Sequence, residues 1–278
     1  MAVVDISALP HARPRHYGRW FGATVLLVAL AYIAWAFAVG NIDWPTVGEY
    51  LFHPRVLWGV AMTIVLSVIA MTIGVMIGTV TALGRTSRNP VISTAAAFYT
   101  WLFRGAPILL QLLIWYNLAL IFPVVGIPGV WHAPTVMVMT PFAAALIAFS
   151  LHEGAYTSEV IRSGLLSIDV GQHEAAKSIG MGYGLTFRRV VLPQALRIVI
   201  PPLGNEFIGL LKMSALASVV GFLELTGTVQ DIYYVNTKIM EMLFVAAIWY
   251  LVIVSFFSVV QMWLERRVSR GVAGGGKR

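Results

Sequence analysis

The chain has 278 residues, of which 59% are hydrophobic and 11% are charged, and it carries a formal net charge of +7. Soluble domains carry about a quarter charged residues, so this composition excludes an ordinary soluble protein and favours one that lies in a membrane. The chain has no cysteine, which also excludes disulfides and thiolate chemistry.

Six apolar stretches follow one another along the chain. Three of them are uncharged over at least twenty residues: 20–39, 56–83 and 242–264. The three weaker ones are residues 105–122, 136–158 and 196–220. Each is about as long as a helix that crosses roughly 30 Å of hydrocarbon. None alternates like a strand of a membrane β-barrel, so the sequence predicts an all-α integral membrane protein with about six transmembrane helices.

The first apolar stretch has two interpretations. Three arginines precede it within residues 13–19, and small residues follow it at 36–38, as in a cleavable signal peptide. The stretch is longer than the apolar core of about 7–15 residues that such peptides have. We therefore expect a retained additional transmembrane helix at residues 20–40, preceded by a basic N-terminus at residues 1–19.

Basic residues are distributed unevenly between the loops. Most of the 19 lysines and arginines fall in residues 1–19, 84–104, 159–195 and 265–278, which alternate with the loops expected on the other side. By the positive-inside rule, both termini are expected in the cytoplasm. The basic excess then reflects topology and contact with membrane lipid, so we expect no nucleic-acid partner.

Two glycines in the second stretch, Gly74 and Gly78, form a GxxxG pair. This spacing favours the close approach of another helix, in the same chain or across a dimer.

A polar segment at residues 169–193 interrupts the apolar pattern. Asp169 and Gln172 have the spacing of a capping box, which predicts a short helix over residues 171–179. Gly180 fits the left-handed end of such a helix. These signals favour an ordered element over a solvated loop.

The rest of this segment predicts a second helix. That helix is expected to end near Leu192, with Pro193 in the first turn of the following span. On the first helix, Ala175 and Ala176 would form a flat patch where another backbone can approach closely. We therefore expect a helix–turn–helix on the cytoplasmic face that docks on a partner.

The polar segment resembles the EAA loop of ABC-importer permeases. That loop has the pattern EAA-x3-G-x9-I-x-L-P, and residues 174–193 read EAAKSIGMGYGLTFRRVVLP. The glycine of the pattern falls on Gly180 and its proline on Pro193, with Val190 in place of isoleucine.

Longer blocks extend the resemblance to about residues 57–270. The blocks FRGAPILLQLLIWYNLAL, HEGAYTSEVIRSGLLSIDVGQHEAAKSIG and LPQALRIVIPPLGNEFIGLLK are similar to permeases of the polar amino-acid type, which serve histidine, glutamate, glutamine, arginine or opines. One departure is KMSAL at residues 212–216, where the family usually has K-x-T-S-L.

The resemblance implies a permease subunit of an ATP-binding-cassette importer for polar amino acids in the bacterial cytoplasmic (inner) membrane. Its fold would be the five-helix core of type I ABC importers at residues 57–264, with the additional N-terminal helix before it and a basic cytoplasmic tail at residues 265–278. The EAA loop, at about residues 169–193, would be the coupling element. The residues that inherit this ATPase-coupling role are Glu174, Ala175, Ala176 and Gly180.

The same resemblance implies a set of partners. These are two copies of an ABC ATPase subunit that bind ATP-Mg, an extracytoplasmic amino-acid-binding protein, a second permease copy or a sister permease, and the polar amino acid itself. The sequence has no phosphate-binding loop, no nucleophile motif and no metal-ligand spacing. We therefore expect no catalytic residue, no metal site and no cofactor on this chain.

Charged residues within the membrane are costly, and they are by default candidates for function. Glu159 lies near the cytoplasmic end of its stretch, where it is expected to pair with Arg162. Glu206 and Lys212 lie about 240° apart around one helix, so they cannot pair with each other. A zwitterionic amino acid offers both complementary charges.

The candidate substrate pathway therefore comprises Glu153, Asn205, Glu206 and Lys212. As an alternative, Glu153 and Lys212 neutralise each other between helices. At the level of the whole chain, the alternative function is an ion-coupled secondary amino-acid transporter that acts without an ATPase. A membrane-embedded enzyme is disfavoured because no catalytic cluster is visible.

Overall fold

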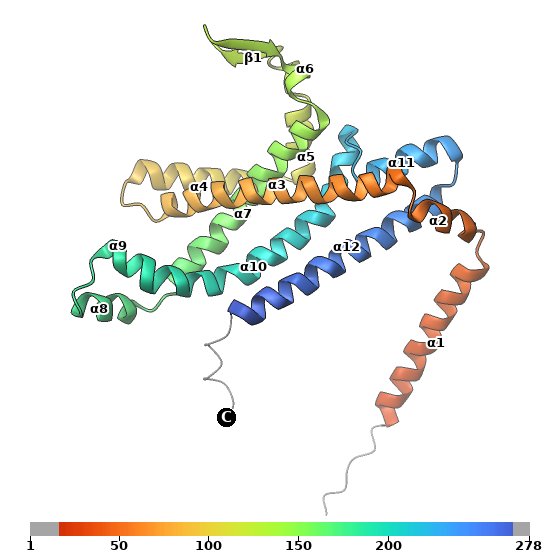
Figure 1. Ribbon diagram of the computed structural model, residues 1–278, viewed down its shortest axis with the longest axis horizontal. Coiled ribbons are helices and arrows are strands. Elements are labelled where there is room, and N and C mark those ends of the chain that lie inside the picture. Colours follow the sequence, from red (N-terminus) through yellow and green to blue (C-terminus); the bar gives the residue numbers. More distant parts are fainter. Residues whose placement is uncertain (1–16, 269–278) are drawn as a thin grey trace, which may run out of the picture. The chain divides into compact units, whose positions relative to one another are not determined.

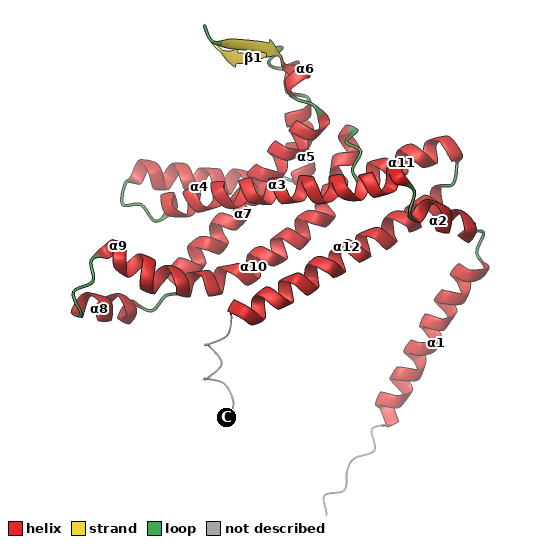
Figure 2. Ribbon diagram, viewed as in Figure 1, coloured by secondary structure: helices red, strands yellow, loops and turns green. Residues whose placement is uncertain are grey.

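The computed structural model describes residues 17–268 (Figure 1). Most of the expected basic N-terminus and most of the expected basic tail therefore lie outside the described residues. In the described part, almost the whole chain is helical, and the strands form one short hairpin (Figure 2). The chain divides into two compact units, Met1–Trp44 and Pro45–Arg278.

The first unit contains helix α1 (Tyr17–Val39), which has 23 residues, with no acidic residue in its first turn and no basic residue in its last. It matches the additional helix predicted at residues 20–40, with a start three residues earlier. The apolar composition that predicted it is enough for a helix of this length to cross a membrane.

The second unit holds the remaining elements, whose bounds are as follows. They are α2 (Trp44–Leu51), α3 (Pro54–Arg85), α4 (Pro90–Gly105), α5 (Ile108–Tyr116), β1 (Val124–Ile127), β2 (Trp131–Pro134), α6 (Thr135–Val138), α7 (Pro141–Leu166), α8 (Val170–Ser178), α9 (Tyr183–Thr186), α10 (Leu192–Met213), α11 (Leu225–Asn236) and α12 (Ile239–Val268). Short 3-10 turns cover Leu118–Leu120 and Ser214–Val220, and a π-helical turn covers Phe187–Val191.

Four helical stretches are long and apolar enough to cross a membrane: α1, α3, the continuous stretch Tyr183–Val220, and α12. The pair α4 and α5 meets the same criteria jointly, although the two helices are bent by 100° at the break between them. Four of the six predicted spans therefore coincide with such helices. The span predicted at residues 105–122 differs from the structure, and the helix at the span predicted at residues 136–158 does not meet these criteria.

The span predicted at residues 105–122 is wrong as a single helix, because α5 has only nine residues. The bend before it follows from Pro107, which cannot donate a backbone hydrogen bond and which favours the extended conformation found at Ala106. The side chain of Gln111 stabilises the corner. Its Nε2 donates to the carbonyls of Phe103 at 3.0 Å and Ala106 at 2.9 Å.

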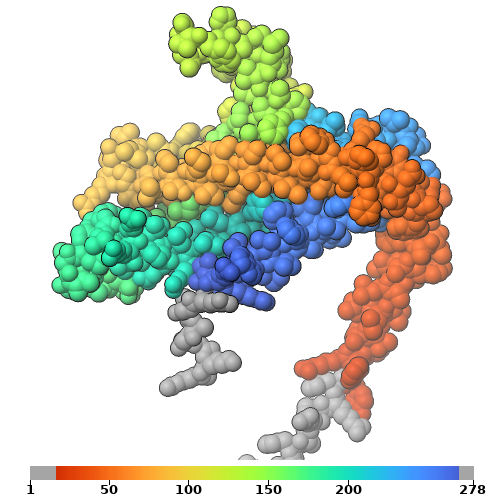
Figure 3. All heavy atoms as spheres, in the orientation of Figure 1, coloured from red at the N-terminus to blue at the C-terminus, as the bar shows by residue number. Residues whose placement is uncertain are grey.

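After α5 the chain forms an antiparallel hairpin that projects from the rest of the second unit (Figure 3). Val124 pairs with Pro134 and Ile127 with Trp131. A turn joins the strands, and Gly129 adopts a φ of +76° there, which costs glycine little.

Helix α7 corresponds to the span predicted at residues 136–158. It has 26 residues, but its composition is too polar for it to be identified as a membrane span, so that part of the prediction stays a prediction. The helix packs against α3, α4, α5 and α10. Protein rather than lipid therefore covers most of its surface, which explains why polar residues are tolerated on it.

The close packing of α3 on α7 depends on the two glycines. A Cβ at Gly74 would collide with Glu153, and one at Gly78 would collide with Thr157. The Thr157 hydroxyl donates to the Gly74 carbonyl at 3.1 Å. The predicted close approach is confirmed, and the helix that approaches belongs to the same chain.

An apolar core holds α3, α5, α7 and α10 together. Its buried members include Leu66, Ala70, Leu112, Phe149 and Leu210. Two of these helices, α7 and α10, also carry His152, Tyr156 and Glu206, so the core fixes the relative positions of these three residues.

The helix predicted to end near Leu192 continues without a break into α10, so that boundary is wrong. The Leu192 N–H donates to the Phe187 carbonyl, five residues back. The turn is wider there than in an α-helix. It makes room before Pro193, whose ring would otherwise clash with the carbonyl four residues earlier.

Candidate functional site

A polar cavity of about 450 Å³ lies between the α4–α5 corner, α7 and α10. We call it the Glu206 cavity, and its lining residues are Arg104, Gly105, Ala106, Pro107, Ile108, His152, Tyr156, Glu206 and Met213. The corner encoded by Pro107 brings the end of α4 against the other two helices. His152 and Tyr156 are four residues apart on α7, and Glu206 and Met213 are seven apart on α10, so each pair shares one helix face.

The Glu206 cavity contains a cation and an anion that do not form a salt bridge with each other. The Arg104 guanidinium lies over the Tyr156 ring, 5.2 Å from its centroid, and its charge acts on the Glu206 carboxylate. Neither residue forms a salt bridge in the described part of the chain. Both charges therefore remain able to bind a ligand.

His152 adds a polar atom to this region. Its ring lies 4.6 Å from the Tyr156 ring between centroids. Its Nδ1 is buried without a hydrogen-bond partner in the described part of the chain. Buried polar atoms are normally paired, so this nitrogen is a candidate to bind a ligand or a water.

Of the four predicted pathway residues, one lines the Glu206 cavity and three do not. Glu206 lines the cavity. Glu153 is buried against Gly74, and the charge of Glu206 acts on it. Asn205 faces α12, where its Oδ1 accepts a hydrogen bond from Gln261 Nε2 at 2.9 Å. Lys212 is exposed and is not among the residues that line the cavity.

No ion pair between Glu153 and Lys212 is recorded in residues 17–268. Sequence analysis also missed Arg104 and Tyr156 as members of the site. The available signal was the sequence RGAP at residues 104–107, where a cation comes directly before a proline corner.

A second cavity, of about 440 Å³, adjoins the first. We call it the Arg85 cavity, and its lining residues are Arg85, Ala97, Thr100, Trp101, Arg104, Gly105, Tyr156 and Glu159. Three of them, Arg104, Gly105 and Tyr156, line both cavities.

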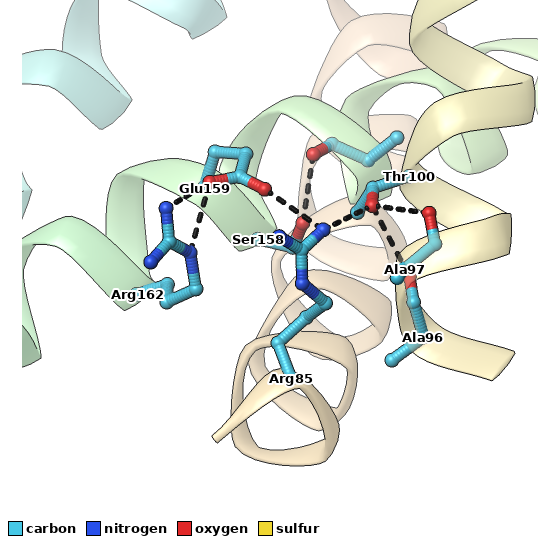
Figure 4. Close-up of polar contacts among 8 residues, drawn as sticks. Arg85, Ala96, Ala97, Thr100, Ser158, Glu159 and Arg162 are labelled. Atoms are coloured by element: carbon cyan, nitrogen blue, oxygen red, sulfur yellow. Dashed lines mark hydrogen bonds and ion pairs between the residues drawn. The ribbon is translucent and has the colours of Figure 1, made fainter. Parts of the chain in front are cut away.

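The Arg85 cavity contains an ion network that links α3 to α7 (Figure 4). Glu159 Oε2 accepts from Arg162 Nε at 3.0 Å and Nη2 at 2.8 Å, which confirms the predicted pair. The other oxygen, Oε1, lies 3.2 Å from Arg85 Nη1. That nitrogen also donates to the Thr100 hydroxyl at 2.7 Å.

The polar segment forms an ordered helical turn at one end of the unit (Figure 1). Helix α8 begins one residue before the predicted 171–179 and is capped by Asp169, whose Oδ1 accepts from the Gly171 N–H. Its end is a Schellman motif, because Gly180 N–H donates to Lys177 and Met181 N–H to Ala176. Gly180 has the left-handed φ of +80°, as predicted.

The capping box is only half formed. Gln172 does not return to the N-cap; its Oε1 instead accepts from Gln194 Nε2 at 3.1 Å. Of the residues predicted to couple to an ATPase, Glu174, Ala175 and Gly180 are exposed, whereas Ala176 is 4% exposed and faces its own chain. The expected flat patch of two alanines therefore reduces to Ala175 on the open face.

Several known proteins are similar to this chain. The arginine transport system permease protein ArgU of Corynebacterium glutamicum is 39% identical over 264 residues, which is 94% of this chain and 83% of that protein. The L-cystine transport system permease protein TcyB of Bacillus subtilis is 38% identical over 233 residues, 84% of this chain and 94% of that protein. Because the match to ArgU leaves so little of this chain uncovered, it includes most of α1.

Solved structures show the same fold. A crystal structure of an amino acid ABC transporter with histidines has a TM-score of 0.71 and 36% identity, covering 82% of this chain and all of that one. The MetNI methionine ABC transporter in inward-facing conformations has a TM-score of 0.56 at 20% identity, which supports the fold alone.

The family described as binding-protein-dependent transport system inner membrane component matches residues 74–270, more than half of the chain. This match is consistent with the long apolar helices and with the ordered helical segment at α8. The chain therefore belongs to that family of multi-pass membrane proteins.

Proposed function

We propose that this chain is the permease subunit of an ABC importer for polar amino acids, and that the amino acid passes through the Glu206 cavity. The role of the cavity is inferred from one observation: Arg104 and Glu206 line the same cavity without an ion pair between them. The named relatives transport arginine and L-cystine, which supports the substrate class.

The chemistry of the cavity suits a free amino acid. Its α-carboxylate would bind the Arg104 guanidinium, and its α-ammonium would bind the Glu206 carboxylate. The volume of about 450 Å³ is in the usual range of roughly 300–1,000 Å³ for small-molecule sites. Ile108 and Met213 supply apolar wall for the side chain of the ligand.

Transport in this proposal is driven by a separate ATPase, two copies of which bind ATP-Mg. The exposed residues of α8, Glu174 and Ala175, together with Gly180 at its end, form the coupling surface. An extracytoplasmic amino-acid-binding protein would deliver the substrate, and a second permease copy or a sister permease would complete the pathway. Both termini would lie in the cytoplasm, with α7 as a further span.

The test is to purify the tagged chain from its own host in mild detergent and to identify what co-purifies with it. An ATPase subunit in near-stoichiometric amount, with hydrolysis stimulated by an amino acid and its binding protein, is the expected result. If the chain is instead solitary and moves amino acids down an ion gradient, the secondary-transporter alternative replaces this proposal.

A further inference from the structure

The Arg85 cavity has no role in the function proposed above, yet it adjoins the Glu206 cavity. Arg104, Gly105 and Tyr156 line both cavities, so the two spaces meet at these residues. The Arg104 side chain is exposed and rests on the Tyr156 ring. A long, flexible arginine in this position can keep hold of a carboxylate while the ligand moves from one cavity to the other.

The two cavities differ in what they offer the ammonium group of an amino acid. In the Glu206 cavity the carboxylate of Glu206 forms none of the recorded salt bridges. In the Arg85 cavity both oxygens of Glu159 are engaged, one by Arg85 and the other by Arg162. Because the guanidinium groups of Arg85, Arg104 and Arg162 outnumber the one carboxylate of Glu159, this cavity favours the carboxylate of an amino acid over its ammonium group.

Arg85 is partly satisfied in the same network. One of its nitrogens, Nη1, contacts both Glu159 and Thr100, whereas a guanidinium has five N–H donors. It can therefore still bind a carboxylate, but Glu159 neutralises part of its charge. A ligand should bind here more weakly than in the Glu206 cavity.

We propose that the Arg85 cavity is a second, weaker station for the carboxylate of the transported amino acid, reached from the Glu206 cavity by way of Arg104. This proposal rests on the function proposed above. The affinity for the amino acid falls from the Glu206 cavity to the Arg85 cavity, because the ammonium contact is lost before the carboxylate contact. This decrease favours release of the amino acid.

The natural absence of cysteine allows a direct test with single-cysteine variants. Ala97→Cys reports on the Arg85 cavity alone, and Met213→Cys on the Glu206 cavity alone. Val235→Cys is the control, because Val235 is 83% exposed and lines neither cavity. Each variant is purified with its ATPase, without binding protein, and labelled with a small neutral methanethiosulfonate reagent in the presence of increasing L-arginine or L-glutamine.

The amino acid is expected to slow the labelling of both cavity variants. Protection of Ala97→Cys should need an amino-acid concentration roughly tenfold or more above that for Met213→Cys, because one charged contact is missing in the Arg85 cavity. Agmatine, which is arginine without its carboxylate, should fail to protect Ala97→Cys. In the Ala97→Cys background, Glu159→Gln should lower the amino-acid concentration needed to slow labelling, because it frees Arg85.

Protection of Met213→Cys without any protection of Ala97→Cys would overturn the second station and leave the proposed function intact. If neither variant is protected, the role of the Glu206 cavity fails as well. Slowing of Ala97→Cys labelling by phosphatidylglycerol vesicles, but not by the amino acid, would assign the cavity to a lipid headgroup and also overturn the proposal. The labelling of the cysteine variants decides the question even if Glu159→Gln does not fold.

Discussion

The amide Nε2 of Gln194 donates to Gln172 Oε1 at 3.1 Å and to the Val190 carbonyl at 3.0 Å. This one side chain therefore ties α8 to the π-helical turn that leads into α10. Since α10 carries Glu206, a displacement of α8 can be passed to the cavity through a contact that the sequence motif does not include.

Gln194→Ala should weaken this transmission without preventing assembly, because the EAA residues remain unchanged. We expect the amount of amino acid transported per ATP hydrolysed to fall about two- to fivefold, consistent with the loss of one ordinary hydrogen bond. The measurement is uptake and ATP hydrolysis in the same proteoliposomes. Gln172→Ala should have a similar effect, and the double variant should add little to either. An unchanged transport-to-hydrolysis ratio in both single variants would show that the contact transmits nothing.

Glu206→Gln and Arg104→Gln should each lower amino-acid uptake by at least about tenfold, because each removes one charge that the zwitterion needs. Hydrolysis of ATP should still respond to the binding protein, since neither residue lies on α8. Asn205→Ala is the matched control, because the Asn205 amide faces Gln261 on α12. Normal uptake by Glu206→Gln would remove that residue from the pathway.

Gly78→Ala should destabilise the protein by roughly 1–3 kcal/mol, the usual cost of an overpacked contact. The new methyl group would meet the Thr157 hydroxyl and the backbone of α7. Gly209→Ala is a suitable control because a Cβ at Gly209 in α10 would meet nothing within 4 Å. The comparison is the thermal unfolding midpoint of the two variants in one detergent. Equal midpoints would mean that α3 and α7 can separate at little cost.

Local signals predicted the structure well where a few neighbouring residues decide it. Asp169 and Gly180 set the two ends of α8, because caps act within about one helical turn. Pro107 is an equally local signal for the corner, but the span predicted at residues 105–122 ran across it. The same local signals failed to show that α9 and α10 are continuous, since a π-helical turn accommodates Pro193.

The composition of the cavity was only partly predictable, because it depends on contacts between distant segments. Glu206 was identified as a charge that needs a partner. Arg104 was not, since its position beside Tyr156 exists only once the corner folds α4 against α7. The inward orientation of Ala176 also depends on how α8 packs on its own chain, which the EAA pattern does not encode.

The two alanines of α8 should now behave differently when each is replaced by aspartate. A docking patch formed by both alanines predicts that Ala176→Asp leaves membrane insertion intact and abolishes assembly with the ATPase. Because Ala176 is 4% exposed and its carbonyl closes the Schellman motif, the buried charge in Ala176→Asp should also lower the thermal stability of the chain. Ala175→Asp places its charge on the open face, so it should reduce co-purification of the ATPase and leave thermal stability unchanged. Both properties can be measured on the same preparations. Stoichiometric ATPase bound to Ala175→Asp would mean that the open face of α8 is not the coupling surface.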